Sequence, residues 1–226
     1  MFVGHYSAAL AAKAAEPSAP LWTYVIGCQL LDVGWSGLIM TGAEKMRVDP
    51  SLPGSSLVLY HMPWTHSLPG AVAWSLAAAL AVRLALKLPW RAAVFVGLTV
   101  FSHWLLDLLV HRPDLELWFG AGKVGFGLWN YPVIEQAVEI GLLAVAGAFW
   151  AGQRVREGRR VWPAALFLTL LVAVQIIAML TPPGGGATQT AIMALAVYLA
   201  LGAVAWLIDR RPVDAADRLP ASAVRA

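Results

Sequence analysis

The chain has 226 residues, of which 59% are hydrophobic and only 13% are charged, and its mean hydropathy is +0.68. A soluble domain carries about 25% charged residues, because polar groups have to cover its large surface. The composition therefore excludes an ordinary soluble enzyme, a disordered regulator and a nucleic-acid-binding module. The net charge of +3 comes from basic residues placed between apolar segments, which is typical of membrane topology.

The first segment, residues 1–20, lacks the basic residues that precede the apolar part of a signal peptide. It is predicted to be a short helix that ends near Glu16 and Pro17. The single cysteine, Cys28, cannot form an intramolecular disulfide, and we expect it to pack as a small apolar side chain.

Six further segments are apolar enough to cross a bilayer, whose core of about 30 Å needs roughly 20 helical residues. In chain order they are Leu21–Met40, Ser67–Leu88, Ala92–Leu106 with its flanks, Val133–Trp150, Val161–Leu180 and Thr188–Ile208. The sequence thus predicts an all-α, polytopic membrane bundle of about six transmembrane helices and a short N-terminal helix. Residues 1–210 form its single domain, and residues 211–226 are predicted to be a flexible cytoplasmic tail.

Basic residues lie at three places that six alternating crossings put on one side of the membrane. These are Arg83, Lys87 and Arg91; Arg154, Arg156, Arg159 and Arg160; and Arg210 and Arg211. Lys and Arg are enriched on the cytoplasmic side, so this side and both chain termini are predicted to be cytoplasmic. The long connections 42–64 and 112–130 then face the other side, where binding loops or lids are expected.

Ionisable residues at membrane depth are costly and are functional candidates. His103, Asp107 and His111 follow one another at i, i+4 and i+8, and 100° per residue places them within about 80° of one helix face. A polar stripe that only bonds to a neighbouring helix is one explanation. Two imidazoles and a carboxylate at this spacing favour a metal site instead.

Other ionisable residues fall at the same predicted level of the bundle. They are Asp32 in the first span, His61 and His66 before the second, and Glu135 and Glu139 at the start of the fourth. Imidazole and carboxylate ligands suit zinc, with manganese and iron as alternatives. The sequence therefore predicts a divalent metal site near the outer surface of the bundle.

His5 is placed on the opposite side by the predicted topology. Either the first segment is re-entrant or interfacial and brings His5 to the site, or the first span has a different orientation. A surface histidine on a short amphipathic helix is the third interpretation of the same residue.

The ordered set of His5, Asp32, HMPWTHSL (61–68) and SHWLLD (102–107) resembles the bacterial membrane-bound metal-dependent hydrolases, a family of small inner-membrane proteins. The resemblance covers roughly the first 110 residues, and the HxxxTHSL-like element is its most specific part. It implies hydrolytic activity with a bound metal in the bacterial inner membrane. The ligands it implies are His66, His103 and Asp107, together with His5, Asp32 and His61.

Two positions depart from the family pattern. Gly34 stands where a second aspartate of a Pro-Asp-x-Asp step is expected, and Met62 stands in place of an arginine. The missing carboxylate could mean one metal instead of two, a substitute ligand such as His111 or Glu135, or a lost activity.

The preferred hypothesis is a hydrolase in which the metal activates water and Glu135 or Glu139 acts as general base. The depth of the site suggests a lipid-like ester or phosphoester as substrate, with membrane lipids as the surroundings and no nucleic-acid partner. A proton or metal-ion transporter using the same His and carboxylate groups is the alternative, and a non-catalytic membrane scaffold is a third. The sequence does not predict an oligomeric state.

Overall fold

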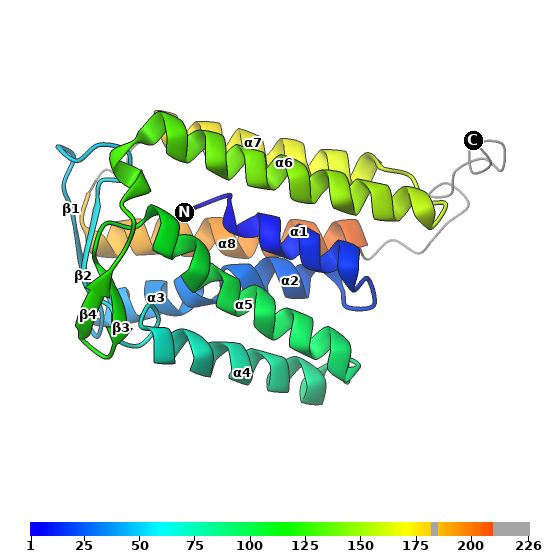
Figure 1. The fold of residues 1–226 in the computed structure, drawn as a ribbon, viewed down its shortest axis with the longest axis horizontal. Helices are drawn as coiled ribbons and strands as arrows, with labels where there is room; N and C mark the ends of the chain where they lie inside the picture. Colours follow the sequence, from blue (N-terminus) through cyan, green and yellow to red (C-terminus); the bar gives the residue numbers. More distant parts are fainter. Residues whose placement is uncertain (182–184, 210–226) are drawn as a thin grey trace.

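The protein is a bundle of helices closed at one end by two small β-hairpins, as a computed structural model that describes residues 1–181 and 185–209 shows (Figure 1). The helices are α1 (His5–Ala15), α2 (Leu21–Cys28), α3 (Leu30–Thr41), α4 (Leu68–Ala85), α5 (Trp90–Val110), α6 (Pro132–Arg156), α7 (Trp162–Leu180) and α8 (Ala187–Asp209), with a short 3-10 helix η1 (Leu128–Asn130). The strands are β1 (Lys45–Val48), β2 (Leu57–His61), β3 (Leu115–Trp118) and β4 (Ala121–Val124).

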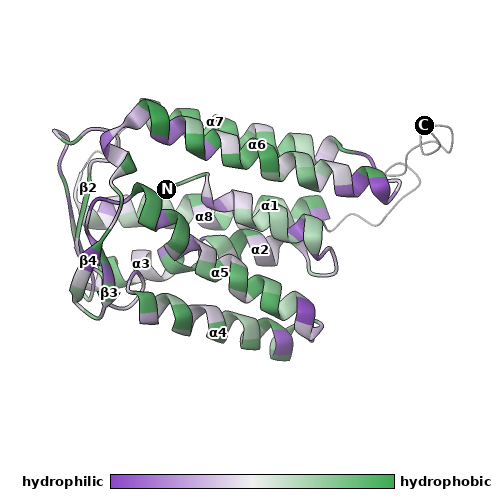
Figure 2. Cartoon of the chain, viewed as in Figure 1, coloured by the Kyte–Doolittle hydropathy of each residue, from purple (hydrophilic) through white to green (hydrophobic). Residues whose placement is uncertain are grey.

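Among the residues that the structure describes, five helices, α4 to α8, are long and apolar enough to cross a membrane, with mean hydropathies of 1.5 to 2.4 over their best windows. Hydrophobic residues make up most of the length of these helices, whereas many of the hydrophilic residues lie at the two ends of the bundle (Figure 2). The expected helical membrane bundle is confirmed. The expected short N-terminal helix is α1, which ends at Ala15, next to the predicted boundary.

The predicted first span, Leu21–Met40, is not one continuous helix. It is divided at Gln29 into α2 and α3, and the Gln29 backbone leaves the helical conformation with φ −112° and ψ 7°. The Gln29 side chain is fully buried and donates a hydrogen bond to the Phe2 carbonyl at 3.2 Å. The break therefore joins the two short helices to the segment that precedes α1.

The helices pack so that α1, α2 and α8 lie between the α6–α7 pair and the α4–α5 pair (Figure 1). The largest apolar core forms around α1 and α2, where Tyr6, Trp150 and Phe167 are at most 1% exposed. α4 and α5 approach closely at Gly97, where a Cβ atom would lie 3.0 Å from the Ser75 carbonyl oxygen.

The turns from α4 to α5 and from α6 to α7 lie at one end of the bundle, and both hairpins lie at the other (Figure 1). The basic residues of these two turns are thus gathered at one end, as the alternating crossings require. The remaining basic pair, at 210 and 211, and the predicted tail lie outside the described residues.

The two long connections contain the hairpins, which were expected only as loops or lids. β1 pairs with β2 and β3 pairs with β4, both antiparallel. An isolated parallel bridge between Ser67 and Glu116 joins the second hairpin to the start of α4. Ser67 also caps α4, since its hydroxyl accepts a hydrogen bond from Gly70 N at 3.1 Å.

Candidate metal centre

Four of the five histidines direct Nε2 at the carboxylate of Asp107, a buried residue of α5. Asp107 Oδ1 lies 3.0 Å from His5 Nε2 and 3.5 Å from His111 Nε2. Asp107 Oδ2 lies 3.1 Å from His103 Nε2 and 3.6 Å from His66 Nε2. The two oxygens of one carboxylate therefore face two neighbouring pairs of imidazoles.

A second carboxylate, that of Asp32 on α3, lies on one side of this cluster only. Its Oδ1 atom is 3.3 Å from His66 Nε2 and 3.5 Å from His103 Nε2. Its Oδ2 atom accepts a hydrogen bond from the Tyr198 hydroxyl at 2.8 Å. Asp32 is thereby held in place from α8 while its other oxygen faces the imidazoles.

The imidazoles of His103 and His111 are oriented by oxygen atoms on their outer side. His103 Nδ1 donates to the Cys28 carbonyl oxygen at 2.7 Å, and His111 Nδ1 donates to Asp114 Oδ1 at 2.8 Å. A carbonyl and an ionised carboxylate can only accept, so the proton of each neutral ring is on Nδ1. Each Nε2 atom then presents a lone pair to the Asp107 carboxylate, which is the usual arrangement of a metal-binding histidine.

Lone pairs on imidazole nitrogens and carboxylate oxygens repel one another at these distances unless a cation lies between them. His5 Nε2 and His103 Nε2 are buried, and neither makes a hydrogen bond of good geometry within the described part of the chain. Two sets of donor atoms lie within 4.8 Å of one another: His5 with His103 and Asp107, and Asp32 with His66 and His103. This buried His/Asp group could hold a metal ion.

The surroundings of His111, which follows the last turn of α5, also favour a positive charge. Burial alone lowers the pKa of its imidazole, but Asp107 and Asp114 beside it more than offset burial, and the pKa is raised above its ordinary value. The two carboxylates thus favour a cation at His111 Nε2, which a proton or a metal ion can supply.

The first segment of the chain enters the bundle and brings His5 to the cluster, which is the first of the three alternatives for this residue. α1 begins at His5, and the Met1 amino nitrogen lies 3.0 Å from Asp107 Oδ1. Glu139 of α6 accepts hydrogen bonds from the backbone N–H groups of Phe2 and Gly4, each at 2.9 Å. These contacts hold the segment inside the bundle and place the His5 ring 3.8 Å from His103, stacked upon it.

The structure brings together six of the predicted site residues: His5, Asp32, His66, His103, Asp107 and His111. His61 is placed elsewhere, at the end of β2, where it pairs with Lys45 and is half-buried. Glu139 is buried, but both its oxygens accept from backbone N–H groups. Glu135, one turn earlier, is also buried and accepts a hydrogen bond from Gln136 Nε2 at 2.7 Å.

Several residues that support the cluster were not predicted. They are Tyr198, which bonds Asp32; Asp114, which bonds His111; and Glu44 with Thr65, which stand behind His66. Asp114 follows His111 by three residues, so its spacing offered a signal. Glu44 and Tyr198 are separated from their partners by long stretches of chain, and no local pattern indicates them.

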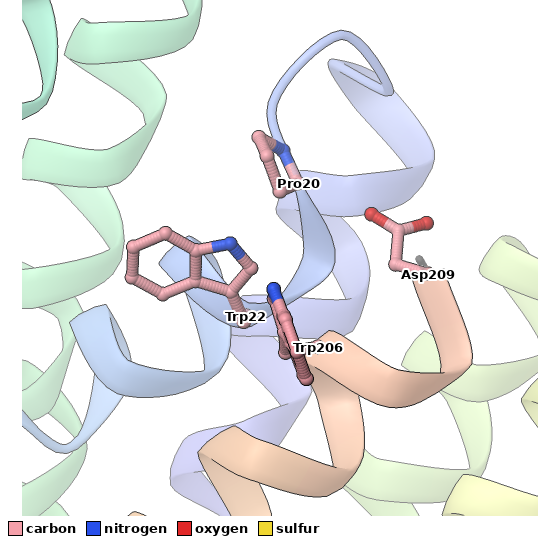
Figure 3. Close-up of a pocket in the computed structure, with 4 residues that line it drawn as sticks. All are labelled: Pro20, Trp22, Trp206 and Asp209. Atoms are coloured by element: carbon pink, nitrogen blue, oxygen red, sulfur yellow. The ribbon is translucent and has the colours of Figure 1, made fainter. Parts of the chain in front are cut away.

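The cluster lies toward the hairpin end of the bundle. His103 and Asp107 are seven and three residues before Val110, where α5 ends, which at 1.5 Å per residue is about 10 and 5 Å. A separate pocket, lined by Pro20, Trp22, Trp206 and Asp209, lies where α2 begins and α8 ends (Figure 3). That pocket is at the other end of the bundle and is not part of this site.

No protein-family model matches the chain, and no curated protein or solved structure matches it.

Proposed function

We propose that the protein is a membrane-embedded, metal-dependent hydrolase. The observation that carries the proposal is the set of imidazole Nε2 atoms that converge on Asp107, with the outer nitrogens of His103 and His111 already bonded to oxygen. Polar groups that only link neighbouring helices would pair hydrogen-bond donors with acceptors. At Asp107 Oδ2 and Asp32 Oδ1, acceptors face acceptors, as a cation site requires, whereas at Asp107 Oδ1 the Met1 amino group already supplies a positive charge.

His66, His103, Asp32 and Asp107 would hold one divalent ion, since they form the group with two carboxylates. His5 and His111 face the other oxygen of Asp107 and offer ligands for a second ion. Imidazole and carboxylate donors suit zinc, with manganese or iron as alternatives. When bound, such an ion supplies Lewis-acid chemistry and an activated water.

The protein groups have distinct roles in this proposal. Tyr198 and Asp114 orient the Asp32 carboxylate and the His111 ring. Glu139 anchors the segment that carries His5, because its oxygens are taken by backbone N–H groups. Glu135 bonds a side chain, that of Gln136, instead of backbone N–H groups, and of the two carboxylates it is the one we propose as the general base that takes a proton from water.

The position of the cluster indicates an amphiphilic substrate. The site lies about 5 to 10 Å inside the hairpin end of α5, and in a bilayer that α5 spans from end to end this would be near the depth of the bond between a lipid headgroup and its apolar part. We therefore propose an ester or phosphoester of a lipid-like molecule as substrate. We also propose that the hairpin end faces away from the cytoplasm, because the two turns rich in basic residues, from α4 to α5 and from α6 to α7, lie at the other end (Figure 1).

Reconstitution of the purified protein into proteoliposomes tests the proposal. We expect cleavage of a headgroup-labelled phospholipid or an isoprenoid phosphate ester that a chelator stops and added zinc restores. His103→Ala and Asp107→Ala should abolish cleavage, whereas His61→Gln, away from the cluster, should leave it within about two-fold. Proton or metal-ion flux without any cleavage would favour a transporter and overturn the hydrolase.

A further inference from the structure

Glu44 is a buried carboxylate behind the metal cluster, between the end of α3 and β1, and it is 1% exposed. Its Oε1 atom accepts hydrogen bonds from the backbone N–H groups of Trp64 and Thr65, each at 2.9 Å. Its Oε2 atom accepts a hydrogen bond from the Thr65 hydroxyl at 2.7 Å. Both oxygens of Glu44 are thus engaged by the residues just before His66.

The Thr65 hydroxyl connects Glu44 to His66. Thr65 Oγ1 lies 2.7 Å from His66 Nδ1, and a hydroxyl has one proton to donate but can also accept. An ionised Glu44 can only accept, so the Thr65 proton is directed to Glu44. Thr65 Oγ1 is then left to accept the proton of His66 Nδ1, and His66 Nε2 keeps its lone pair for the cluster.

His66 differs in this respect from His103 and His111. The outer nitrogens of those two histidines face a carbonyl and a carboxylate, which fix the ring proton directly. A threonine hydroxyl alone leaves the His66 tautomer undecided, because it can donate to Nδ1 as readily as accept from it. The group behind the hydroxyl therefore decides which nitrogen of His66 is free to bind metal.

We propose that Glu44, acting through Thr65, is a positioning residue that fixes the tautomer of His66 for metal binding. The inference rests on the proposed metal centre for its purpose, although the effect on the His66 ring is a property of the metal-free protein as well. Partners of this kind contribute about 10- to 100-fold to metal affinity. The proposed role of Glu44 requires no contact with a substrate.

Glu44→Gln is the informative substitution. The amide oxygen of the new side chain should accept hydrogen bonds from the N–H groups of Trp64 and Thr65. In the flipped orientation the amide NH₂ group would face these two N–H donors, which is unfavourable. The amide NH₂ group then faces Thr65 Oγ1 and donates to it. The Thr65 proton is pushed toward His66 Nδ1, and the His66 proton moves to Nε2, where it opposes a metal ion.

The first measurement is the ¹⁵N spectrum of histidine-labelled, metal-free protein at a pH where the rings are neutral, with His66 assigned by its loss in His66→Gln. We expect a proton on Nδ1 of His66 in the wild type and on Nε2 in Glu44→Gln. The second measurement is zinc affinity by competition with a chelating dye, which should fall about 10- to 100-fold in Glu44→Gln. Thr65→Val should weaken zinc binding, whereas Thr65→Ser, which keeps the hydroxyl, should retain it.

Glu116→Gln is the matched control. Glu116 is equally buried, accepts hydrogen bonds from Met62 N and Gly120 N and pairs with Lys123 at 3.4 Å; within the described residues it holds the same loop without a hydrogen bond or ion pair to a histidine. This substitution should lower the melting temperature without moving the His66 proton. An unchanged His66 tautomer in folded Glu44→Gln, or an equal change in Glu116→Gln, would overturn the inference. If the His66 proton moves in Glu44→Gln as expected but the wild type binds no zinc, the hydrolase proposal alone is overturned.

Discussion

Replacing the two carboxylates of the cluster one at a time should give unequal losses of metal. Asp107→Asn removes the negative charge that all four imidazoles face, since the carboxylate oxygens lie 3.0 to 3.6 Å from their Nε2 atoms. Asp32→Asn removes the negative charge of a carboxylate that faces two of the four imidazoles, those of His66 and His103. Loss of a supporting partner already costs about 10- to 100-fold in affinity. Loss of the shared ligand should therefore cost more than about 100-fold, or about 2.8 kcal/mol at 1.4 kcal/mol per factor of ten.

The assay is zinc affinity and stoichiometry by competition with a chelating dye, on protein purified in detergent. Asp107→Asn should lose tight binding altogether, Asp32→Asn should retain weaker binding, and Asp114→Asn should lose the least because Asp114 contacts only the outer nitrogen of His111. Full zinc occupancy in Asp107→Asn would refute the reasoning, as would an Asp114→Asn variant that loses as much affinity as Asp107→Asn.

Three further outcomes are expected. Removing metal with a chelator should lower the melting temperature of the wild type, because an ion present at 1,000 times its Kd that binds only the folded state stabilises that state by about 4 kcal/mol. An unchanged melting temperature on chelation would contradict a tightly bound ion. Gly125→Ala should destabilise the protein by about 1 to 3 kcal/mol and weaken zinc binding. Gly125 has φ +154°, and a Cβ atom there would lie 2.5 Å from the His111 carbonyl oxygen. Thermal melting measures the loss of stability, and dye competition measures the loss of zinc affinity. Lys13→Met should destabilise the protein by about 3 kcal/mol without altering metal affinity, because buried Lys13 pairs with Asp209 at 3.1 Å at the far end of the bundle; lost zinc binding in a folded variant would contradict the separation of the two ends.

The membrane fold followed from hydropathy, because each of the five long helices in the described part of the chain has to cover a bilayer's thickness with apolar residues. The division of Leu21–Met40 at Gln29 did not follow, since the polar group that occupies the break is the Phe2 carbonyl, contributed by another part of the chain. The hairpins were also missed, because strands of four or five residues give too short an alternation to stand out among glycines and aromatics.

The cluster was predictable where its residues follow one another at helical spacing. His103, Asp107 and His111 were indicated by their i, i+4 pattern, and the structure directs all three at one point. The position of His5 was ambiguous, since a count of membrane crossings cannot show that a short segment enters the bundle without crossing it. Gly34, which stands where the resembled family has an aspartate, lies against Trp74, whose ring carbon would be 3.0 Å from a Cβ atom. The structure thus places an aromatic ring where that carboxylate would have to begin.

Metal analysis of the purified protein tests the central claim most directly. Elemental analysis by mass spectrometry should find one or two tightly bound divalent ions per chain, zinc foremost. The double variant His103→Ala/Asp107→Ala, prepared in the same detergent and folded by its melting curve, should carry none. A wild type that holds no divalent metal after incubation with zinc, or a double variant that keeps full occupancy, would contradict the assignment of this cluster as a metal centre.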